Sequence, residues 1–301
     1  MTATADMIIE RRKLRRRLTF WRILAIGAVL IAALALIPRP GGIGGEHIAK
    51  ITIEGVINDD PLRLAAIEDL IDDDDVKALI IHVNSPGGAV VASENLYEML
   101  REVAAEKPTV TLMNEYAASG GYVASLAGDY IVARGNTLTG SIGVVSQIPE
   151  FSELFETLGI GITKVKSAPL KAEPSYTEAP SPEALEAQAS IVSDMFIWFR
   201  DLVAERRGIS GTALEDVADG RAFTGRQALD LGLIDALGDE DMLRDWLAEN
   251  REIDRDTEVV EHFWGAADQP WPLSLFSGLM AWDPAIDSLS NRIPRIYAIL
   301  H

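Results

Sequence analysis

The hydrophobic positions of the chain form one long apolar run near the amino terminus, followed by shorter segments with the periods of strands and helices. Residues 23–37 contain no charged side chain, and seven basic residues precede them. A helix over residues 18–37 would be about 30 Å long, the thickness of a bilayer's hydrocarbon core, with Arg22 reaching the interface. We expect a basic cytoplasmic segment at residues 1–17 and a transmembrane signal anchor at residues 18–38. This orientation would place the rest of the chain on the outer side of the cytoplasmic membrane.

A cleaved signal peptide is the alternative interpretation of this run. Ala33-Leu34-Ala35 resembles a small-x-small cleavage site. That site lies inside the apolar run, however, and the segment before the run is long for a signal peptide, so an uncleaved anchor is favoured. A buried core helix is a third interpretation, and the basic residues gathered at one end of the run argue against it.

After a Gly-rich linker at residues 39–47, strand-like and helix-like segments alternate. Short apolar runs that stop at turn residues predict strands, and apolar positions spaced i, i+3, i+4 and i+7 predict helices. The expected strands are residues 48–57, 78–83 (ending at a Pro-Gly-Gly turn), 108–113 and 129–134, and the expected helices are residues 92–107, 121–126, 182–207, 224–231 and 239–250. This alternation predicts an α/β fold with a mainly parallel sheet, in which sites form at the carboxyl ends of strands.

Composition and charge narrow the function classes. The 301 residues include no cysteine, which excludes disulfides, Cys-based zinc sites and a thiol nucleophile. The net charge is −19 although the first 40 residues are basic, so the body of the protein is strongly acidic. Because contacts to phosphates need clustered Lys and Arg, we expect no nucleic-acid partner. We also expect no metal and no cofactor.

The segment "NEYAASGGYVAS" (residues 114–125) is the first candidate for chemistry. Ser119 precedes two glycines at a predicted turn between a strand and a helix, where a hydroxyl can be exposed and backbone amides can gather around an anion. A serine nucleophile needs a proton acceptor, and none of the four histidines is an obvious one. A tight turn of small residues is the alternative interpretation.

Three further segments are ambiguous by themselves. "NSPGG" (residues 84–88) offers glycine amides suited to an oxyanion but is also a common turn. "TGSIGV" (residues 139–144) is another small-residue turn. "KVKSAPLKAEPS" (residues 164–175) contains three lysines in a Pro-interrupted stretch, where lysines are usually solvated.

In their order along the chain, these segments resemble the signal peptide peptidase A family. The segments that carry the resemblance are "VKALIIHVNSPGG", "ASGGYVAS", "LTGSIGV", "KSAPLKAEPSYTEAPSPE" and "DGRAFTGRQALDLGLIDALG". The family comprises membrane-bound serine proteases with a Ser-Lys dyad, on the fold of repeated β-β-α units shared with Clp protease and the crotonases. Each segment occurs once, as in the short form of the family. The resemblance implies a peptidase domain at residues 48–250 and leaves the role of residues 251–301 open.

The resemblance assigns a role to each matching position. Ser119 corresponds to the nucleophile and Lys171 to the general base. The amides of Gly88 and Gly120 correspond to the oxyanion hole, and the hydroxyl of Ser141 corresponds to the group that hydrogen-bonds the lysine amine. A lysine base must be neutral, and burial that lowers a lysine pKa by about 3 units costs about 4 kcal/mol. An apolar substrate groove would supply that burial.

Two positions depart from the family pattern. The family commonly has Asp and then a Ser-Pro turn after the lysine, whereas this chain continues Ala172-Glu173-Pro174. His82 stands where arginine is often found. Its closeness in sequence to the site raises a Ser-His alternative, but strand alternation gives no reason to aim it at Ser119, and a structural role is favoured.

The expected function is that of a membrane-anchored serine endopeptidase that hydrolyses hydrophobic peptides, above all cleaved signal peptides. The resemblance also implies a homo-oligomer with active sites between subunits. The alternatives are quality control of membrane proteins by the same dyad, and an inactive membrane-anchored scaffold. The relation to the crotonases also raises acyl-CoA chemistry as an alternative. The acidic body argues against it, because the sequence shows no basic patch that could bind the CoA phosphates.

Overall fold

The structure is a computed structural model that describes residues 21–22, 45–263 and 297–299. The chain divides after Gly44, and the unit that begins at Gly45 contains the whole fold described below. The predicted anchor at residues 18–38 lies outside the described residues, apart from Trp21 and Arg22. Among the residues that the structure describes, no helix combines the length and hydropathy needed to cross a membrane.

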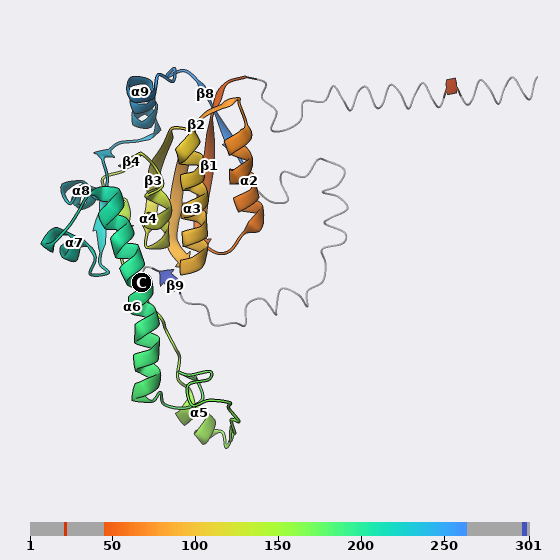
Figure 1. Cartoon of the computed structure of the whole chain (residues 1–301), viewed down its shortest axis with the longest axis vertical. Helices are drawn as coiled ribbons and strands as arrows, with labels where there is room; N and C mark the ends of the chain where they lie inside the picture. The colour runs from red at the N-terminus through yellow and green to blue at the C-terminus, as the bar shows by residue number, and fades with distance from the viewer. Residues whose placement is uncertain (1–20, 23–44, 264–296, 300–301) are drawn as a thin grey trace, which may run out of the picture. The chain divides into compact units, whose positions relative to one another are not determined.

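A mixed sheet organises this unit (Figure 1). Its strands are β1 (His47–Ile57), β2 (Val76–Ala89), β3 (Thr109–Ala118), β4 (Tyr130–Ala133), β5 (Leu138–Gly140), β6 (Ala222–Thr224), β7 (Ala236–Leu237), β8 (Glu258–His262) and β9 (Tyr297–Ile299). The main order is β6-β5-β3-β2-β1-β8, and β4 pairs with both β3 and β7. Among the described strands, all pairs are parallel except β5 with β6 and β2 with β9. The predicted α/β fold with a mainly parallel sheet is confirmed.

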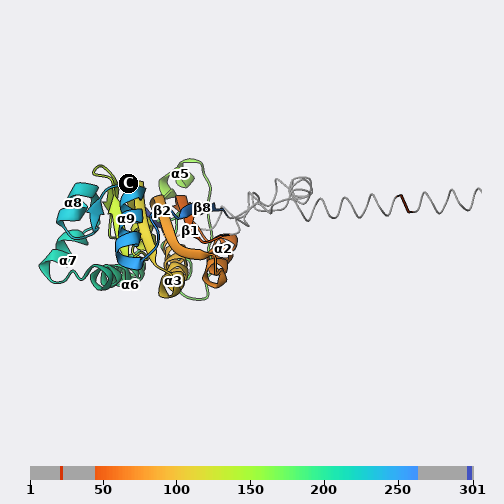
Figure 2. The same cartoon turned by 90° about the horizontal axis from the view of Figure 1, so that it is seen from above.

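Helices cover both faces of the sheet (Figure 2). The described helices are α2 (Pro61–Asp72), α3 (Val90–Glu106), α4 (Gly120–Ser125), α5 (Ser152–Thr157), α6 (Pro182–Arg207), α7 (Thr212–Val217), α8 (Gly225–Asp230) and α9 (Glu240–Arg251), of which α5 lies away from the sheet. From β2 through α4, the order of strands and helices agrees with the expected order of elements. The repeat of β-β-α units stays a prediction.

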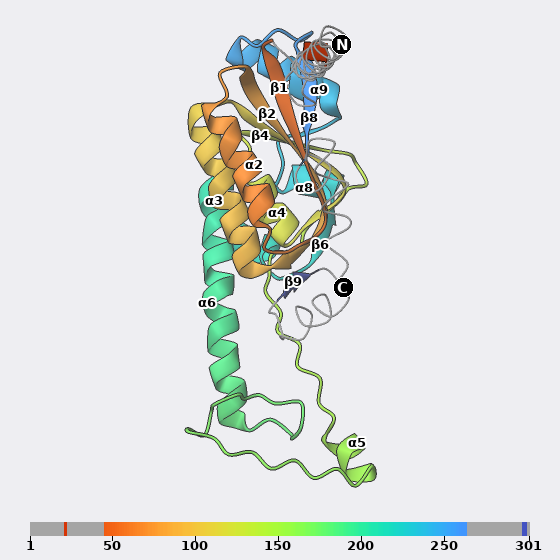
Figure 3. The ribbon, with the colours of Figure 1, turned by 90° about the vertical axis from the view of Figure 1, so that its right-hand side faces the viewer.

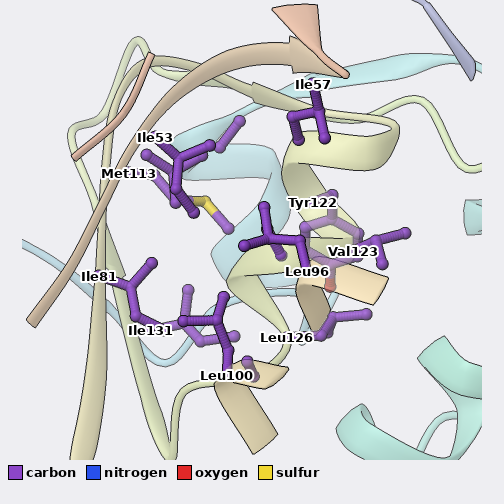
Figure 4. Close-up of a cluster of buried hydrophobic side chains, with 14 of the residues drawn as sticks. Ile53, Ile57, Ile81, Leu96, Leu100, Met113, Tyr122, Val123, Leu126 and Ile131 are labelled. Carbon is purple, nitrogen blue, oxygen red and sulfur yellow. The ribbon is translucent and has the colours of Figure 1, made fainter. Parts of the chain in front are cut away.

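Strand alternation divides the core into two clusters. Leu79, Ile81 and Val83 of β2 point to the face covered by α2, α3, α4 and the end of α6, where the larger cluster lies. Figure 4 shows part of this cluster, with Leu96 of α3 beside Tyr122 of α4. Ala78 and Ile80 point to the other face, where Leu243 and Leu247 of α9 cover them. The period of two along β2 therefore decides which layer each side chain joins.

The strand that was predicted to stop at the Pro-Gly-Gly turn continues through it, so that boundary was wrong. β2 runs to Ala89, because β1 pairs with Gly87 and Gly88 after a register shift between Glu54 and Val56. Gly87 has φ +107°, which a residue with a side chain rarely adopts. The Pro-Gly-Gly sequence does make the backbone irregular, but pairing with β1 accommodates that irregularity and keeps the segment in the sheet.

Several observed elements were not predicted from the pattern, namely α2, α5, α7, β5, β6, β7, β8 and β9. Helix α2 begins at Pro61, and the Asp60 carboxylate caps it by accepting hydrogen bonds from the amides of Leu62 and Arg63. Strand β8 pairs with β1, so the sheet includes residues beyond the predicted domain boundary at residue 250. Residues 264–296 of the predicted carboxyl-terminal extension lie outside the described residues.

Residues 145–198 form an arm that runs away from the sheet (Figure 3). The arm contains α5 and the first part of α6. As predicted, Ser181 caps α6, with its hydroxyl accepting a hydrogen bond from the Ala184 amide at 3.2 Å, and Gly208 ends it with φ +67°. Phe199, Leu202 and Val203 near the end of the helix are buried in the core. Helix α6 is therefore fastened to the body by its last turns, while its beginning carries the arm.

Candidate active site

Ser119 occupies a strained turn between β3 and α4. Its φ of +53° and ψ of −120° lie in a region that non-glycine residues rarely adopt, at a cost of about 1–3 kcal/mol. The Ser119 amide donates to the Gly140 carbonyl at 2.8 Å, and the Ser119 carbonyl accepts from the Val123 amide at 3.0 Å. These two bonds hold the turn from β5 on one side and from α4 on the other.

The Ser119 hydroxyl is buried and has no hydrogen-bond partner. It is the one hydroxyl in this situation among the residues that the structure describes, and the whole residue is 1% exposed. An unsatisfied buried polar group costs about 1–3 kcal/mol, so such groups call for an explanation. Strain and an unpaired hydroxyl at the same residue are typical of a functional site rather than of a structural turn.

Glycine amides approach this turn from two elements. A Cβ on Gly120 would lie 3.2 Å from the Gly88 nitrogen and would collide with the Ser93 hydroxyl. A Cβ on Gly88 would collide with the Ile57 carbonyl. Only glycine fits at both positions, and the backbone of β2 therefore reaches the first residue of α4. The backbones of Gly88 and Gly120, the two residues assigned to the oxyanion hole, therefore lie close together beside Ser119.

Strand β5 brings Ser141 to the same place. Ala118 of β3 pairs with Gly140 of β5, so Ser119 and Ser141 follow the last residues of two adjacent parallel strands. Ser141 also has a positive φ of +49°, and its amide donates to the Arg221 carbonyl at 2.9 Å. It is 8% exposed. Adjacent carboxyl ends of parallel strands are where sites are expected in such a sheet.

Lys171 lies elsewhere, on the exposed part of the arm. Its amide closes a turn by donating to the Ala168 carbonyl at 3.1 Å. Its ammonium forms no hydrogen bond or ion pair with any residue that the structure describes. The structure therefore brings Gly88, Ser119, Gly120 and Ser141 together and leaves Lys171 apart from them within one chain.

The other two lysines of the same stretch are held by carboxylates. Lys164 contacts Glu178 at 2.8 Å and Glu173 at 3.3 Å, and Lys166 contacts Glu173 and, at 3.7 Å, Glu178. The hydrogen bond to Glu178 raises the pKa of Lys164, and the hydrogen bond from Lys166 lowers the pKa of Glu173 to about 2. Carboxylates that favour the ammonium form make Lys164 a poor base. Lys166 is paired with the same two carboxylates, whereas Lys171 is paired with neither of them. Glu173, which departs from the family pattern, pairs with these two lysines.

His82 lies on the opposite face of the sheet from the large core cluster. It shares its side of β2 with Ala78 and Ile80 and lines a hollow with Asn114, Arg134 and Asp239. Burial and, secondarily, the charge of Lys50 lower the pKa of His82. The hollow contains none of the residues assigned to the peptidase site, so the structure gives no support to a Ser-His pair.

Two serines that sequence reasoning missed support the glycine turn. The Ser85 hydroxyl accepts a hydrogen bond from the Gly87 amide at 3.1 Å, and the buried Ser93 hydroxyl donates to the Ala89 carbonyl at 3.0 Å. Both bonds brace the segment that carries Gly88. Ser85 could have been found in the sequence, because it directly precedes Pro-Gly-Gly. The role of Ser93 is recognisable only once α3 is placed against Gly120.

Comparison with known proteins assigns the chain to a family. Residues 101–254, just over half of the chain, match the model of peptidase family S49, and residues 50–136 match that of the Clp protease family. A putative protease of Synechocystis sp. is 33% identical over 230 residues, which cover 76% of this chain and 81% of that protein. A putative signal peptide peptidase SppA of Enterococcus faecium is 32% identical over 235 residues, covering 73% of this chain and 68% of that protein.

Among solved structures, a membrane-bound stomatin-specific protease aligns with a TM-score of 0.46 and 17% sequence identity, over 74% of this chain and 100% of that one. The family model and the two curated relatives confirm the resemblance to signal peptide peptidase A that the sequence segments predicted. The chain belongs to peptidase family S49.

Proposed function

We propose that the chain is a serine endopeptidase with Ser119 as its nucleophile. The observation that carries the proposal is the buried, unpartnered Ser119 hydroxyl on a strained turn beside the backbones of Gly88 and Gly120. Membership of peptidase family S49 supports it independently. The Ser119 hydroxyl lacks a hydrogen-bond acceptor among the described residues, and a neutral amine that takes its proton is the partner that a serine nucleophile requires.

The chemistry follows from these groups. The Ser119 oxygen attacks the carbonyl carbon of the scissile bond while its proton passes to a neutral lysine amine. The charge that develops on the carbonyl oxygen is stabilised by the amides of Gly88 and Gly120. Collapse of the tetrahedral intermediate expels the new amino terminus, which takes the proton from the lysine. A water molecule, deprotonated by the same amine, then releases the acyl group from Ser119.

The lysine in this proposal is Lys171 of a neighbouring copy of the chain. Within one chain Lys171 is exposed and apart from Ser119, whereas a lysine base needs an apolar environment to be neutral. Apolar side chains are exposed along the same arm, among them Leu154, Leu158, Ile160, Ile162, Val165 and Leu170. Exposed apolar surface of this kind marks an interaction site. Burial of the arm against a second copy would cover these side chains and desolvate the amine together.

The proposed substrates are hydrophobic peptides, with cleaved signal peptides as the leading class. Residues 18–38 would anchor the enzyme in the cytoplasmic membrane, with the peptidase unit on the outer side, where such peptides are released. The apolar run supports the anchor, and the likeness to a signal peptide peptidase supports the substrate class.

The decisive experiment is labelling of the purified full chain with a fluorophosphonate, which reacts with activated serines. The wild type should be labelled at Ser119, as located by mass spectrometry of the labelled peptide. Ser119→Ala should abolish labelling without changing the circular dichroism spectrum. Labelling at another serine, or labelling that persists in Ser119→Ala, would overturn the assignment.

A further inference from the structure

Two histidines from distant parts of the chain meet at one edge of the sheet. His47 is the first residue of β1, His262 is the last residue of β8, and the two strands pair in parallel (Figure 1). The Nε2 atoms of the two rings are 3.3 Å apart. The expectation of no metal could not take this pair into account, because the two positions are 215 residues apart in the sequence.

The two rings meet through these nitrogens. Their planes are within 9° of parallel and their centroids are 5.5 Å apart, so the Nε2 atoms are much closer to each other than the ring centres are. Nδ1 of His47 lies 3.1 Å from the Gly45 carbonyl oxygen. A carbonyl can only accept, so Nδ1 carries a proton, and a neutral His47 presents a lone pair at Nε2. In the neutral pair, the Nε2 proton of His262 therefore lies between the rings.

This arrangement has the features of two ligands of one zinc ion. Because Zn–N bonds are about 2.0–2.1 Å long, two imidazole nitrogens on a tetrahedral ion are about 3.3 Å apart, as the two Nε2 atoms are here. A histidine that binds a metal usually donates its other ring N–H to a carbonyl or a carboxylate, as His47 does to Gly45. His47 is buried and held in place, whereas His262 is partly exposed, so an ion can reach the pair from solvent.

We propose that His47 and His262 form a zinc site in which both Nε2 atoms bind the ion. The His262 proton moves from Nε2 to Nδ1 through solvent, so the pair binds the ion without a net loss of protons. Among the described residues no cluster of three or more His, Asp or Glu side chains is arranged for a metal, so water completes the coordination. Imidazole ligands and a tetrahedral separation favour Zn²⁺ over Mg²⁺, which prefers oxygen ligands.

A zinc ion at this position would fasten the edge of the sheet. It would join the start of β1 to the end of β8, and β8 pairs with β1 alone among the described strands. With two protein ligands in place of the four of a structural site, we expect an affinity on the order of micromolar. The site is independent of the proposed peptidase residues, so its test does not depend on activity.

The test measures zinc binding to the full chain, purified without a histidine tag and freed of metal. Competition with a chromogenic chelator gives the zinc affinity of the wild type, His47→Gln and His262→Gln. The chain has four histidines, so His82→Gln and His301→Gln each keep the pair and serve as the matched controls. Denaturant unfolding without zinc checks that every variant is folded. If His47→Gln does not fold, the partly exposed His262 still provides the test.

The wild type and both controls should share one zinc affinity, and the two variants of the pair should bind about 10-fold or more weakly. Long-range nitrogen–proton NMR spectra should show zinc shifting Nε2 of both His47 and His262 and leaving His82 unchanged. Zinc should also slow hydrogen exchange at Val259 and Val260 of β8 in the wild type, whereas Mg²⁺ should not.

Two outcomes would overturn the proposal. Equal zinc affinity in all five proteins would show that carboxylates of the acidic body bind the ion and that the histidine pair does not. Absence of zinc binding by the wild type, with unchanged imidazole resonances, would show that a hydrogen bond alone joins His47 and His262.

Discussion

At the scale of single residues, Ser119 combines two features that oppose stability: a positive φ and a buried hydroxyl without a partner. Ser119→Ala removes the second and keeps the first. We expect the variant to be inactive and more stable than the wild type by about 1 kcal/mol, the lower end of the cost of an unsatisfied polar group. Denaturant unfolding of both proteins measures this difference. A variant less stable than the wild type would show that the hydroxyl has a structural partner.

The three lysines of residues 164–171 differ in their ion-pair partners. Lys164 and Lys166 are paired with Glu173 and Glu178, whereas Lys171 has no such partner in the described chain. Lys171→Ala should therefore reduce kcat for a peptide substrate by at least 1,000-fold, roughly the effect of removing a general base. Lys164→Ala and Lys166→Ala should reduce it less than 10-fold, and they are the matched controls. Equal losses at all three positions would point to an electrostatic role for the whole stretch.

At the scale of elements, the approach of β2 to α4 depends on a glycine. In Gly120→Ala the new Cβ would collide with the Ser93 hydroxyl and lie 3.2 Å from the Gly88 nitrogen. We expect kcat/KM to fall by about 100-fold, as on loss of one oxyanion-hole donor, and the unfolding free energy to fall by about 1–3 kcal/mol. Adding Ser93→Ala removes the colliding atom and should restore part of both losses. No recovery in the double variant would contradict this packing.

The arm contains an ion cluster whose pH range follows from one pKa. The hydrogen bond from Lys166 lowers the pKa of Glu173 from the ordinary 4.5 to about 2. A lowered carboxyl pKa means that the cluster's contribution is fully present above pH 4.5 and is lost as the pH falls toward 2. Carboxyl chemical shifts should give a Glu173 midpoint near pH 2, rising toward 4.5 in Lys166→Ala. A wild-type midpoint of 4.5 would mean that the cluster does not form in solution.

At the scale of the whole molecule, the separation of Lys171 from Ser119 makes a mixing experiment possible. If a neighbouring copy supplies the lysine, Ser119→Ala chains contribute an intact Lys171 and Lys171→Ala chains contribute an intact Ser119. Each variant alone should be inactive, whereas random co-assembly should restore about a quarter of the wild-type sites, since each group is intact with a probability of about one half. Fluorophosphonate labelling of co-expressed chains counts these sites. Mixed oligomers without labelling would place both groups in one chain.

The local features of the fold could be predicted from the sequence because their causes are local. Ser181, Pro182 and Gly208 mark the ends of α6 through capping and backbone preferences that act over a few residues. The apolar run of β2 and the periodic apolar positions of α3 likewise identified a strand and a helix, and the order of segments identified the family. Helix α2 was missed although Asp60 and Pro61 carry a local signal for its start.

The tertiary structure alone decided which of these residues meet. The sequence by itself determined the alternation of strands and helices and the candidate residue types, because periodicity and turn chemistry are written in neighbouring positions. It could not determine that β2 runs through Gly87 and Gly88, because that depends on pairing with β1. It also could not predict that Gly120 contacts Ser93 and Gly88. The exposure of Lys171 and the pairing of Tyr297–Ile299 with β2 were likewise not predictable from the sequence. Each is a relation between segments far apart in the chain, and only strand register and packing bring such segments together.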